Sequence, residues 1–575
     1  MASLVNERRA TGGTAASPAR AIATAEPAGA RRATLLAALG SAISLWAAFP
    51  PLDLWPLAWV APLGWLWLCQ RPTLSGRRPY TAIWFSGFVF WMLTLHWLRY
   101  PHPATSIGWL AASFYFAFYI PAFVALVRAA VWRHRWPLWL AAPVVWTGLE
   151  LLRGHLLTGY TGASLGHTQY RWLALIQVAD FAGAYGVSFL VMLGAAALDG
   201  ALFAARRTTA RRTAASWPAA RWLPLVGASL VVALACGYGT WRLSYQPPAG
   251  PRLKVALIQG SIDTQVKVDP NQRFVVYDHY LALCRQAKRQ HADLDLMIWP
   301  ETMFREPLIT FGDDFAPPVD AEWTADDARL AARRNRQFIG GMTRDLGVAQ
   351  ILGIDRQHLV HRKVEHFNTA LHVDRQGQVA GMYAKMHPVM FGEYIPLGQW
   401  LPWLYEITPV AAALTPGAGP AVFAVGGLRL APNICFENFL PHLVRSQVRQ
   451  LRAAGSEPDV LVNLTNDGWF RGSSELDLHL NCAVFRAVEL RKPFLIAANT
   501  GFSAWVAPTG QIRARGPRHQ PAVVMADVGR DGRQSPYDQW GDLFAGLCLA
   551  ASLGIAAAAL WPRRWSRLPA VQRRS

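Results

Sequence analysis

Long apolar stretches dominate the first 243 residues, and short loops rich in arginine separate them. Most of these stretches are long enough to cross about 30 Å of hydrocarbon as a helix. The pattern therefore predicts a transmembrane bundle over residues 33–243. We expect seven spans there, near 33–49, 55–70, 81–98, 107–127, 137–152, 172–204 and 223–243, and an eighth at 541–562. The stretch 172–204 is too long for one simple span, which predicts a re-entrant or interfacial part.

The chain changes character over residues 244–540, where short β-type apolar runs alternate with segments of helical periodicity. Such alternation predicts an α/β domain with a buried sheet. We expect strands at 254–259, 294–299, 337–341, 370–373, 428–433, 460–464 and 494–498. The expected helices are 272–290, 326–335, 439–454 and 476–491.

The two ends of the chain are polar and basic. Residues 1–32 are rich in Ala, Arg, Gly and Thr without apolar periodicity, which predicts a disordered cytoplasmic tail. Residues 563–575 form a second basic tail, also expected in the cytoplasm. No short apolar segment with a cleavage site follows the first tail, so a removed signal peptide is not expected.

Charge and composition favour a membrane protein of one defined orientation. Only 16% of the residues are charged, against about 25% in a typical soluble domain. The net charge is +20, and its arginines gather in the loops between apolar stretches. With the N-terminus in the cytoplasm, every arginine cluster faces the cytoplasm and residues 244–540 lie in the periplasm, as the positive-inside rule requires. A nucleic-acid-binding face would instead gather on one soluble domain, so no nucleic-acid partner is expected.

Three segments place candidate reactive side chains at strand ends. Glu301 follows the buried-type run that ends in Trp299-Pro300, and the carboxyl ends of strands are where α/β folds place their sites. Lys385 follows a β-type run, and Glu393 lies in the aromatic-rich loop after it. On spacing alone, Glu301 is equally consistent with a solvated loop position. A lysine placed like Lys385 is more often a surface residue, and Glu393 is also consistent with a carboxylate that stabilises its loop.

Cys435 lies where a β-type run turns into a helix. We expect this turn to expose the thiol and to direct a helix N-terminus at it, which would lower the pKa of the thiol. A buried structural cysteine is the alternative, and Cys284 and Cys482 fit it because each lies in an amphipathic helical pattern. The six cysteines show no CxxC pair, so neither a disulfide framework nor a metal site is expected.

Taken together, these segments resemble two related families. The order WPE, YAK, CFE resembles the Glu-Lys-Cys arrangement of the nitrilase (carbon–nitrogen hydrolase) superfamily, as do LVNLTNDGWF, RAVELRKPF and AANTGFSA further on. The membrane half, with LELLRGHLLTGYTGASLGHTQY and DFAGAYGVSFLV, resembles the apolipoprotein N-acyltransferase family. The resemblance implies an α-β-β-α sandwich for residues 244–540.

The resemblance also implies residue roles. Glu301 matches the general base, Lys385 the oxyanion-stabilising lysine and Cys435 the nucleophile. Glu393 and Glu437 match carboxylates that position the lysine and the substrate amine. Three departures concern substrate access: Phe436 replaces a usual Tyr, Val268 a usual Trp, and Thr161-Gly162 a common Pro-Trp.

The implied activity is transfer of an acyl chain from a phospholipid to the α-amine of the diacylglyceryl-modified N-terminal cysteine of lipoproteins. It would proceed through a cysteine thioester, in a monomeric inner-membrane protein, without metal or cofactor. A membrane-tethered amidase acting on a small C–N substrate would use the same three residues, with water as the acceptor. A degenerate lipoprotein-binding scaffold is disfavoured by the intact Glu301, Lys385 and Cys435. A transporter is disfavoured by the α/β domain and by the scarcity of paired charges in the spans.

Overall fold

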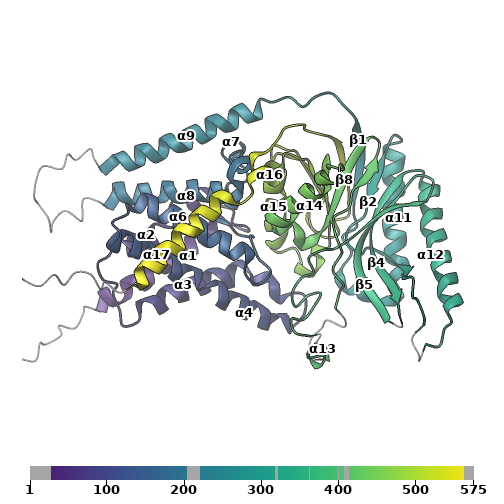
Figure 1. The fold of residues 1–575 in the computed structure, drawn as a ribbon, viewed down its shortest axis with the longest axis horizontal. Coiled ribbons are helices and arrows are strands. Elements are labelled where there is room, and N and C mark those ends of the chain that lie inside the picture. The colour runs from purple at the N-terminus through teal and green to yellow at the C-terminus, as the bar shows by residue number, and fades with distance from the viewer. Residues whose placement is uncertain are drawn as a thin grey trace, which may run out of the picture.

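The computed structural model has a helical half and a two-sheet half that lie end to end (Figure 1). It describes residues 28–203, 221–317, 321–361, 363–398, 400–406 and 413–561. Most of the predicted N-terminal tail, the last residue of the expected span 541–562, the whole predicted tail 563–575, and the loop with Arg206 and Arg212 lie outside the described residues. Within the expected tail 1–32, helix α1 already begins at Ala28.

The helical half is built from the apolar stretches of the sequence. Its α-helices are α1 Ala28–Ala48, α2 Leu63–Cys69, α3 Pro79–Thr94, α4 Thr105–Phe116, α5 Tyr119–Arg128, α6 Leu138–His155, α7 Leu173–Ile176, α8 Ala179–Phe203, α9 Leu223–Leu243 and α17 Leu543–Leu560. Short turns of other helix types join them: η1 Trp55–Trp59, η2 His96–Arg99, η3 Ala129–Arg133 and η4 Leu165–Gln169. The final helix α17 returns from the sheet domain and packs against α6 (Figure 1).

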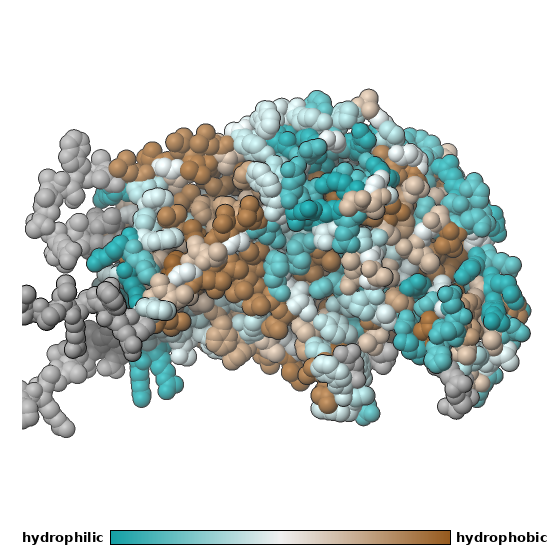
Figure 2. Space-filling model, in the orientation of Figure 1, coloured by the Kyte–Doolittle hydropathy of each residue, from teal (hydrophilic) through white to brown (hydrophobic). Residues whose placement is uncertain are grey.

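Four of the described helical segments are long and apolar enough to cross a membrane: Thr105–Arg133, Ala179–Phe203, Leu223–Leu243 and Leu543–Leu560. The segments Arg32–Ala48 and Trp55–Cys69 are apolar but shorter. Helices therefore occupy all eight predicted stretches, while the number that cross the bilayer stays a prediction. Apolar side chains cover much of the visible surface of this half, whereas the sheet half is mostly polar (Figure 2).

The long stretch 172–204 is divided, as its length suggested. The four-residue helix α7 precedes α8, and α8 is kinked at Gly183, where the backbone adopts a φ of 65°. Glycine tolerates this conformation, and a Cβ added at Gly183 would lie 2.8 Å from the Tyr537 ring. The kink therefore lets α8 approach the end of the sheet domain closely.

The sheet half contains two sheets packed face to face. One has the order β13-β1-β2-β4-β5-β6, with β3 also paired to β4, and the other has the order β12-β11-β10-β9-β8-β7. The strands are β1 Arg252–Gln259, β2 Leu296–Ile298, β3 Phe304–Phe311, β4 Ala349–Val360, β5 Lys363–Val373, β6 Val379–Ala384, β7 Phe423–Val425, β8 Leu428–Ile434, β9 Val460–Thr465, β10 Phe494–Ala498, β11 Ala504–Val506, β12 Ile512–Arg515 and β13 Ala522–Gly529.

Helices cover the outer face of each sheet and complete the expected α-β-β-α order. The longer ones are α11 Arg273–Gln290 and α12 Ala325–Leu346 on the first sheet, and α14 Pro441–Ala453 and α15 Glu475–Leu490 on the second. Short helices are α10 Thr264–Val268, η7 Pro270–Gln272, α13 Trp403–Glu406, η8 Cys435–Phe439, η9 Asp467–Phe470 and α16 Pro536–Trp540. One apolar core lies between the sheets and another between each sheet and its helices.

The predicted strand 337–341 is wrong, because these residues lie inside helix α12. Ala332, Ile339 and Leu346 are buried at helical spacing, so the apolar run is the inner face of an amphipathic helix. A capping box formed by Thr324 and Asp327 begins the helix, and Gly347, with a φ of 67°, ends it. Packing of this apolar face in the core stabilises the helix, although the short apolar run by itself resembles a strand.

Buried polar contacts join the two halves. Arg491 after α15 donates to Asp180 of α8 at 2.6 Å and to the Gln177 side chain at 2.6 Å. Both Arg491 and Asp180 are almost completely buried. In the loop between α6 and η4, the Thr161 hydroxyl donates to the Phe439 carbonyl at 2.5 Å. The membrane half thus contacts the turn that carries Cys435.

Candidate active site

Glu301 lies just beyond the carboxyl end of β2, and its carboxylate is buried and fully engaged. The Asn368 side-chain amide donates to Glu301 Oε1 at 2.6 Å, and the Asn466 backbone N–H donates to Oε2 at 3.0 Å. Asn368 belongs to the first sheet, and Asn466 follows β9 of the second. The carboxylate is therefore held from both sheets, at the point where their carboxyl ends meet.

Lys385 is the first residue after β6, and its ammonium lies between two carboxylates. Its Nζ is 2.7 Å from Glu393 Oε1 and 3.4 Å from Glu301 Oε1. Burial alone would lower the pKa of the ammonium, but Glu393 and Glu301 outweigh burial and raise the pKa above its ordinary value. Lys385 is therefore a fixed cation at neutral pH, suited to stabilising an anion that forms beside it.

Cys435 begins the turn η8 directly after β8, where its φ of 51° is unusual for a residue with a side chain. The thiol interacts electrostatically with both Glu301 and Lys385. The structure thus brings together the three predicted catalytic residues, two from the first sheet and one from the second. Backbone outliers of this kind gather at functional sites.

The expected low pKa of the thiol is wrong. Burial, reinforced by the Glu301 carboxylate, raises the pKa of Cys435 well above its ordinary value, and Lys385 opposes this only in part. The helix expected at 439–454 begins at Pro441, and the turn η8 separates it from the cysteine. A protonated thiol needs a base within the site, and Glu301 is the carboxylate that interacts with it most strongly.

The two predicted supporting carboxylates act on the Lys385 segment in different ways. Glu393 binds the ammonium and also accepts from the Val389 N–H at 2.7 Å. Glu437 is completely buried and accepts from the N–H groups of Met386 and His387, at 2.7 and 3.0 Å. Burial raises the pKa of Glu437 to about 6, although these hydrogen bonds favour its ionised form. Glu437 thereby fixes the backbone that follows the lysine.

Comparison with known proteins assigns both halves of the chain. Residues 41–197 match the apolipoprotein N-acyltransferase N-terminal domain, and residues 254–536 match the carbon-nitrogen hydrolase domain. The apolipoprotein N-acyltransferase of Geobacter metallireducens is 34% identical over 92% of this chain and 95% of its own length. That of Rhodopirellula baltica is 31% identical over 89% of this chain and 94% of its own. The chain belongs to the apolipoprotein N-acyltransferase family.

An amidase of known structure from Nesterenkonia sp. also aligns with this acyltransferase chain, with 20% identity and a TM-score of 0.35. The alignment covers 53% of the chain and 99% of the amidase.

The three positions noted in the sequence as departures from the resembled pattern differ in their surroundings. Phe436 is partly buried between the rings of Phe439 and His387, at centroid distances of 5.4 and 6.1 Å. Val268 is 55% exposed beside the buried Lys267. Thr161 binds the Phe439 carbonyl, so it still supports the nucleophile turn from the membrane half.

Several residues that support the Cys435 turn were not predicted from the sequence. Asp467 and His479 lie 3.1 Å apart, and the other ring nitrogen of His479 is 3.2 Å from the Cys435 carbonyl. With Glu475 they form, among the described residues, a group whose donor atoms lie within 4.8 Å of one another and could hold a metal ion. Because His479 already bridges Asp467 and the Cys435 carbonyl, the arrangement is well suited to fixing the nucleophile turn. The motifs LTNDGWF and HLNCAVF contain these residues, but nothing in their spacing shows that they meet.

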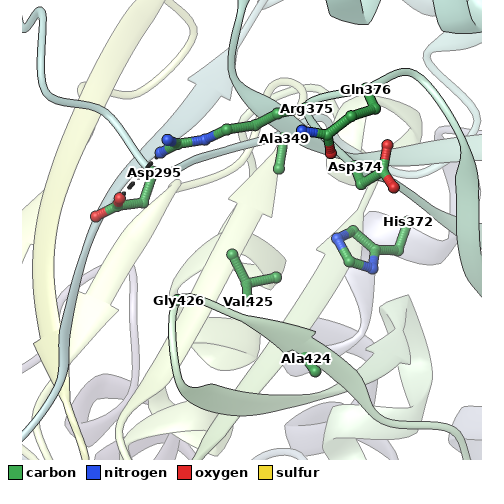
Figure 3. A pocket seen from close by; sticks show the side chains of 9 residues that line it. All are labelled: Asp295, Ala349, His372, Asp374, Arg375, Gln376, Ala424, Val425 and Gly426. Atoms are coloured by element: carbon green, nitrogen blue, oxygen red, sulfur yellow. Dashed lines mark hydrogen bonds and ion pairs between the residues drawn. The ribbon is translucent and has the colours of Figure 1, made fainter.

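A separate hollow of about 330 Å³ lies at the opposite ends of β2 and β4 (Figure 3). Arg375 and Asp295 form an ion pair at 3.1 Å on its wall, and His372 lies among its other lining residues. None of the predicted catalytic residues lines it.

Proposed function

We propose that this acyltransferase moves an acyl chain from a phospholipid to the α-amine of a diacylglyceryl-modified lipoprotein N-terminus, through a thioester on Cys435. The observation that carries the proposal is the buried ion pair of Glu301 and Lys385 at 3.4 Å, with Glu437 joining the backbone after Lys385 to the turn of Cys435. The family to which the chain belongs supports the substrate classes.

In the first half-reaction, Cys435 attacks the ester carbonyl of the phospholipid while Glu301 takes the thiol proton. Lys385 and a backbone N–H near Phe436 stabilise the tetrahedral oxyanion, and one such donor contributes roughly 3 kcal/mol in comparable enzymes. Glu301 then protonates the departing lysophospholipid alcohol. In the second half-reaction Glu301 takes a proton from the incoming amine, which attacks the thioester and releases Cys435.

The proposal includes an arrangement in the bacterial inner membrane. Residues 33–243 and 541–562 would form the eight-span membrane part, and residues 244–540 would lie in the periplasm. The contacts of Arg491 with Asp180 and of Thr161 with Phe439 support a site close to the membrane surface. We further propose that the enzyme acts as a monomer, with neither a cofactor nor a metal.

The test is a two-step experiment on the purified protein. Phospholipid is added first, and the Cys435 peptide is then examined by mass spectrometry, with the other cysteine peptides of the same digest as internal controls. We expect an acyl thioester on Cys435 that a diacylated lipopeptide discharges to an amide. Discharge to free fatty acid without amide would instead support the amidase alternative, and a wild-type Cys435 that never becomes acylated would overturn the proposal.

The segment after Glu393 is proposed as an interfacial lid over the site. Trp400 is 72% exposed and Trp403 53% exposed, whereas Tyr394 and Tyr405 are partly buried. The Tyr405 hydroxyl accepts from the Ile395 N–H at 3.3 Å, which ties the two ends of the segment together. Helix α13, which contains Trp403, projects beside the junction of the two halves (Figure 1). Exposed tryptophans at such a junction are typical of contact with a lipid surface.

Trp400→Ser combined with Trp403→Ser is expected to lower turnover of phospholipid in vesicles by roughly tenfold, because apolar contact with the lipid surface is lost. Acylation of Cys435 by a small soluble ester should change little. Rates on the two donors provide the measurement, and Leu330→Ser combined with Phe338→Ser on the outer helix α12 is the matched control. Unchanged turnover of the vesicle donor would count against the lid.

A further inference from the structure

Lys267 is a buried cation beside the active site for which the mechanism above has no use. It lies in the short helix α10, and only 6% of the residue is exposed. Among the described residues its side chain has one hydrogen-bond partner, the hydroxyl of Thr302, and no carboxylate lies within ion-pair distance. Thr302 directly follows Glu301 in the chain. Lys267 therefore approaches the site from the side of the general base.

Besides this hydrogen bond, the Lys267 ammonium lies 5.8 Å from the centroid of the Trp469 ring, and a buried ammonium with only neutral contacts at short range is unusual. It carries three N–H donors, and charged groups in protein interiors are normally paired with opposite charge. Burial lowers the pKa of Lys267, while the electrostatic attraction of Glu301, then of Asp355 and more weakly of Cys435, favours its charged form. Two donors thus remain for a ligand, next to the base and the nucleophile.

A second cation lies near Lys267. Arg305, in β3, repels the Lys267 ammonium electrostatically, and its nearest carboxylate is Asp355 at 3.8 Å. The Nε of Arg305 is buried without a hydrogen-bond partner in the described part of the chain. Asp355 attracts both cations but lies beyond hydrogen-bond distance of Arg305, so both cations keep N–H donors that can bind an anion.

We propose that Lys267, with Arg305 as a second contact, binds the phosphate diester of the acyl donor. This inference rests on the proposed phospholipid-dependent function. In a glycerophospholipid, only the glycerol unit separates the scissile ester from the phosphate. When the ester carbonyl lies at Cys435 and the leaving oxygen faces Glu301, the phosphate falls on the Glu301 side of the site, where Lys267 lies. The contact would make the enzyme prefer a phospholipid over a neutral lipid with the same acyl chains.

The experiment compares two acyl donors with identical chains, a phosphatidylglycerol and the corresponding diacylglycerol, in the same mixed micelles. The rate of Cys435 acylation in a single turnover is measured for the full-length wild type and for Lys267→Gln. We expect the variant to lose about 10- to 100-fold with the phospholipid, as for removal of a charged hydrogen-bond donor, and less than about threefold with the diacylglycerol. Arg305→Gln should show a smaller loss of the same selectivity.

Two further variants keep the outcome interpretable. Lys267→Arg retains the charge and should retain most of the preference for the phospholipid, which tests the proposal even if Lys267→Gln folds poorly. Lys288→Gln removes a partly exposed lysine from the neighbouring helix α11 and should leave both rates unchanged.

The inference is overturned if Lys267→Gln slows both donors equally, since Lys267 would then support Glu301 rather than the donor. It is equally overturned if neither rate changes. These outcomes differ from failure of the proposed function, in which wild-type Cys435 forms no thioester with either donor.

Discussion

Cys435→Ala is expected to abolish N-acylation, with a loss of at least about 10⁴-fold, as when a covalent nucleophile is removed from comparable enzymes. The thiol interacts with both Glu301 and Lys385, and in the proposed mechanism it holds the acyl chain between the two half-reactions. The fold should persist, because the substitution removes one atom from a partly buried side chain. Mass spectrometry of a diacylated lipopeptide after incubation with enzyme and phospholipid provides the measurement.

Cys284→Ala is the matched control for this experiment. Cys284 is completely buried in helix α11, away from the three residues, so its loss should lower stability by roughly 1 kcal/mol and leave the acylation rate unchanged. Residual acyl transfer by Cys435→Ala above the uncatalysed rate would show that another group carries the acyl chain.

Lys385→Met is expected to damage catalysis and stability together. The loss of an oxyanion donor should lower the rate of Cys435 acylation by about 10²- to 10³-fold. The variant also leaves the Glu301 and Glu393 carboxylates buried without their cation, which costs roughly 3–5 kcal/mol. Single-turnover rates and thermal unfolding measure the two effects separately.

The pH dependence of this variant has a defined sign. In the wild type the pKa of Lys385 is raised, so its contribution is complete below the ordinary lysine pKa of about 10.5 and is lost only above it. The stability difference between Lys385→Met and the wild type should therefore stay constant from neutral pH up to about 10 and shrink only at higher pH, as Lys385 loses its proton.

A second substitution separates charge pairing from catalysis. Adding Glu393→Gln to Lys385→Met removes the carboxylate that lies 2.7 Å from the ammonium, and it should restore part of the lost stability. It should restore none of the activity. Lys254→Met, at an exposed ion pair of the first sheet, is the control and should change neither quantity appreciably. Full activity of Lys385→Met would contradict the proposed oxyanion role.

The sequence predicts the strands and helices whose burial pattern is local. Strands β1, β8, β9 and β10 occur where their apolar runs were found, because each is buried on both faces and reads as continuous apolar sequence. By contrast, the long hairpin of β4 and β5 was missed apart from residues 370–373. Polar residues interrupt both strands where they extend beyond the core, and pairing between them stabilises this part.

The candidate site, too, could be predicted only in part. Glu301, Lys385 and Cys435 could be named because each follows a recognisable strand in a motif. The partners that hold them, such as Asn368 and Asn466, could not, because those contacts join the two sheets across long sequence separations. The pKa of Cys435 depends on burial and on Glu301, neither of which the cysteine's own segment reveals.

The buried contact between Asp180 and Arg491 limits how these enzymes can exchange parts. A chimera that joins this sheet domain to the helices of a relative lacking an acidic residue at the position of Asp180 would bury an uncompensated guanidinium where the two halves meet. Chimeras between family members should therefore fold well only when Asp180 and Arg491 are transferred together. One ion pair thus constrains the two halves to evolve together, in addition to the reaction to which both contribute.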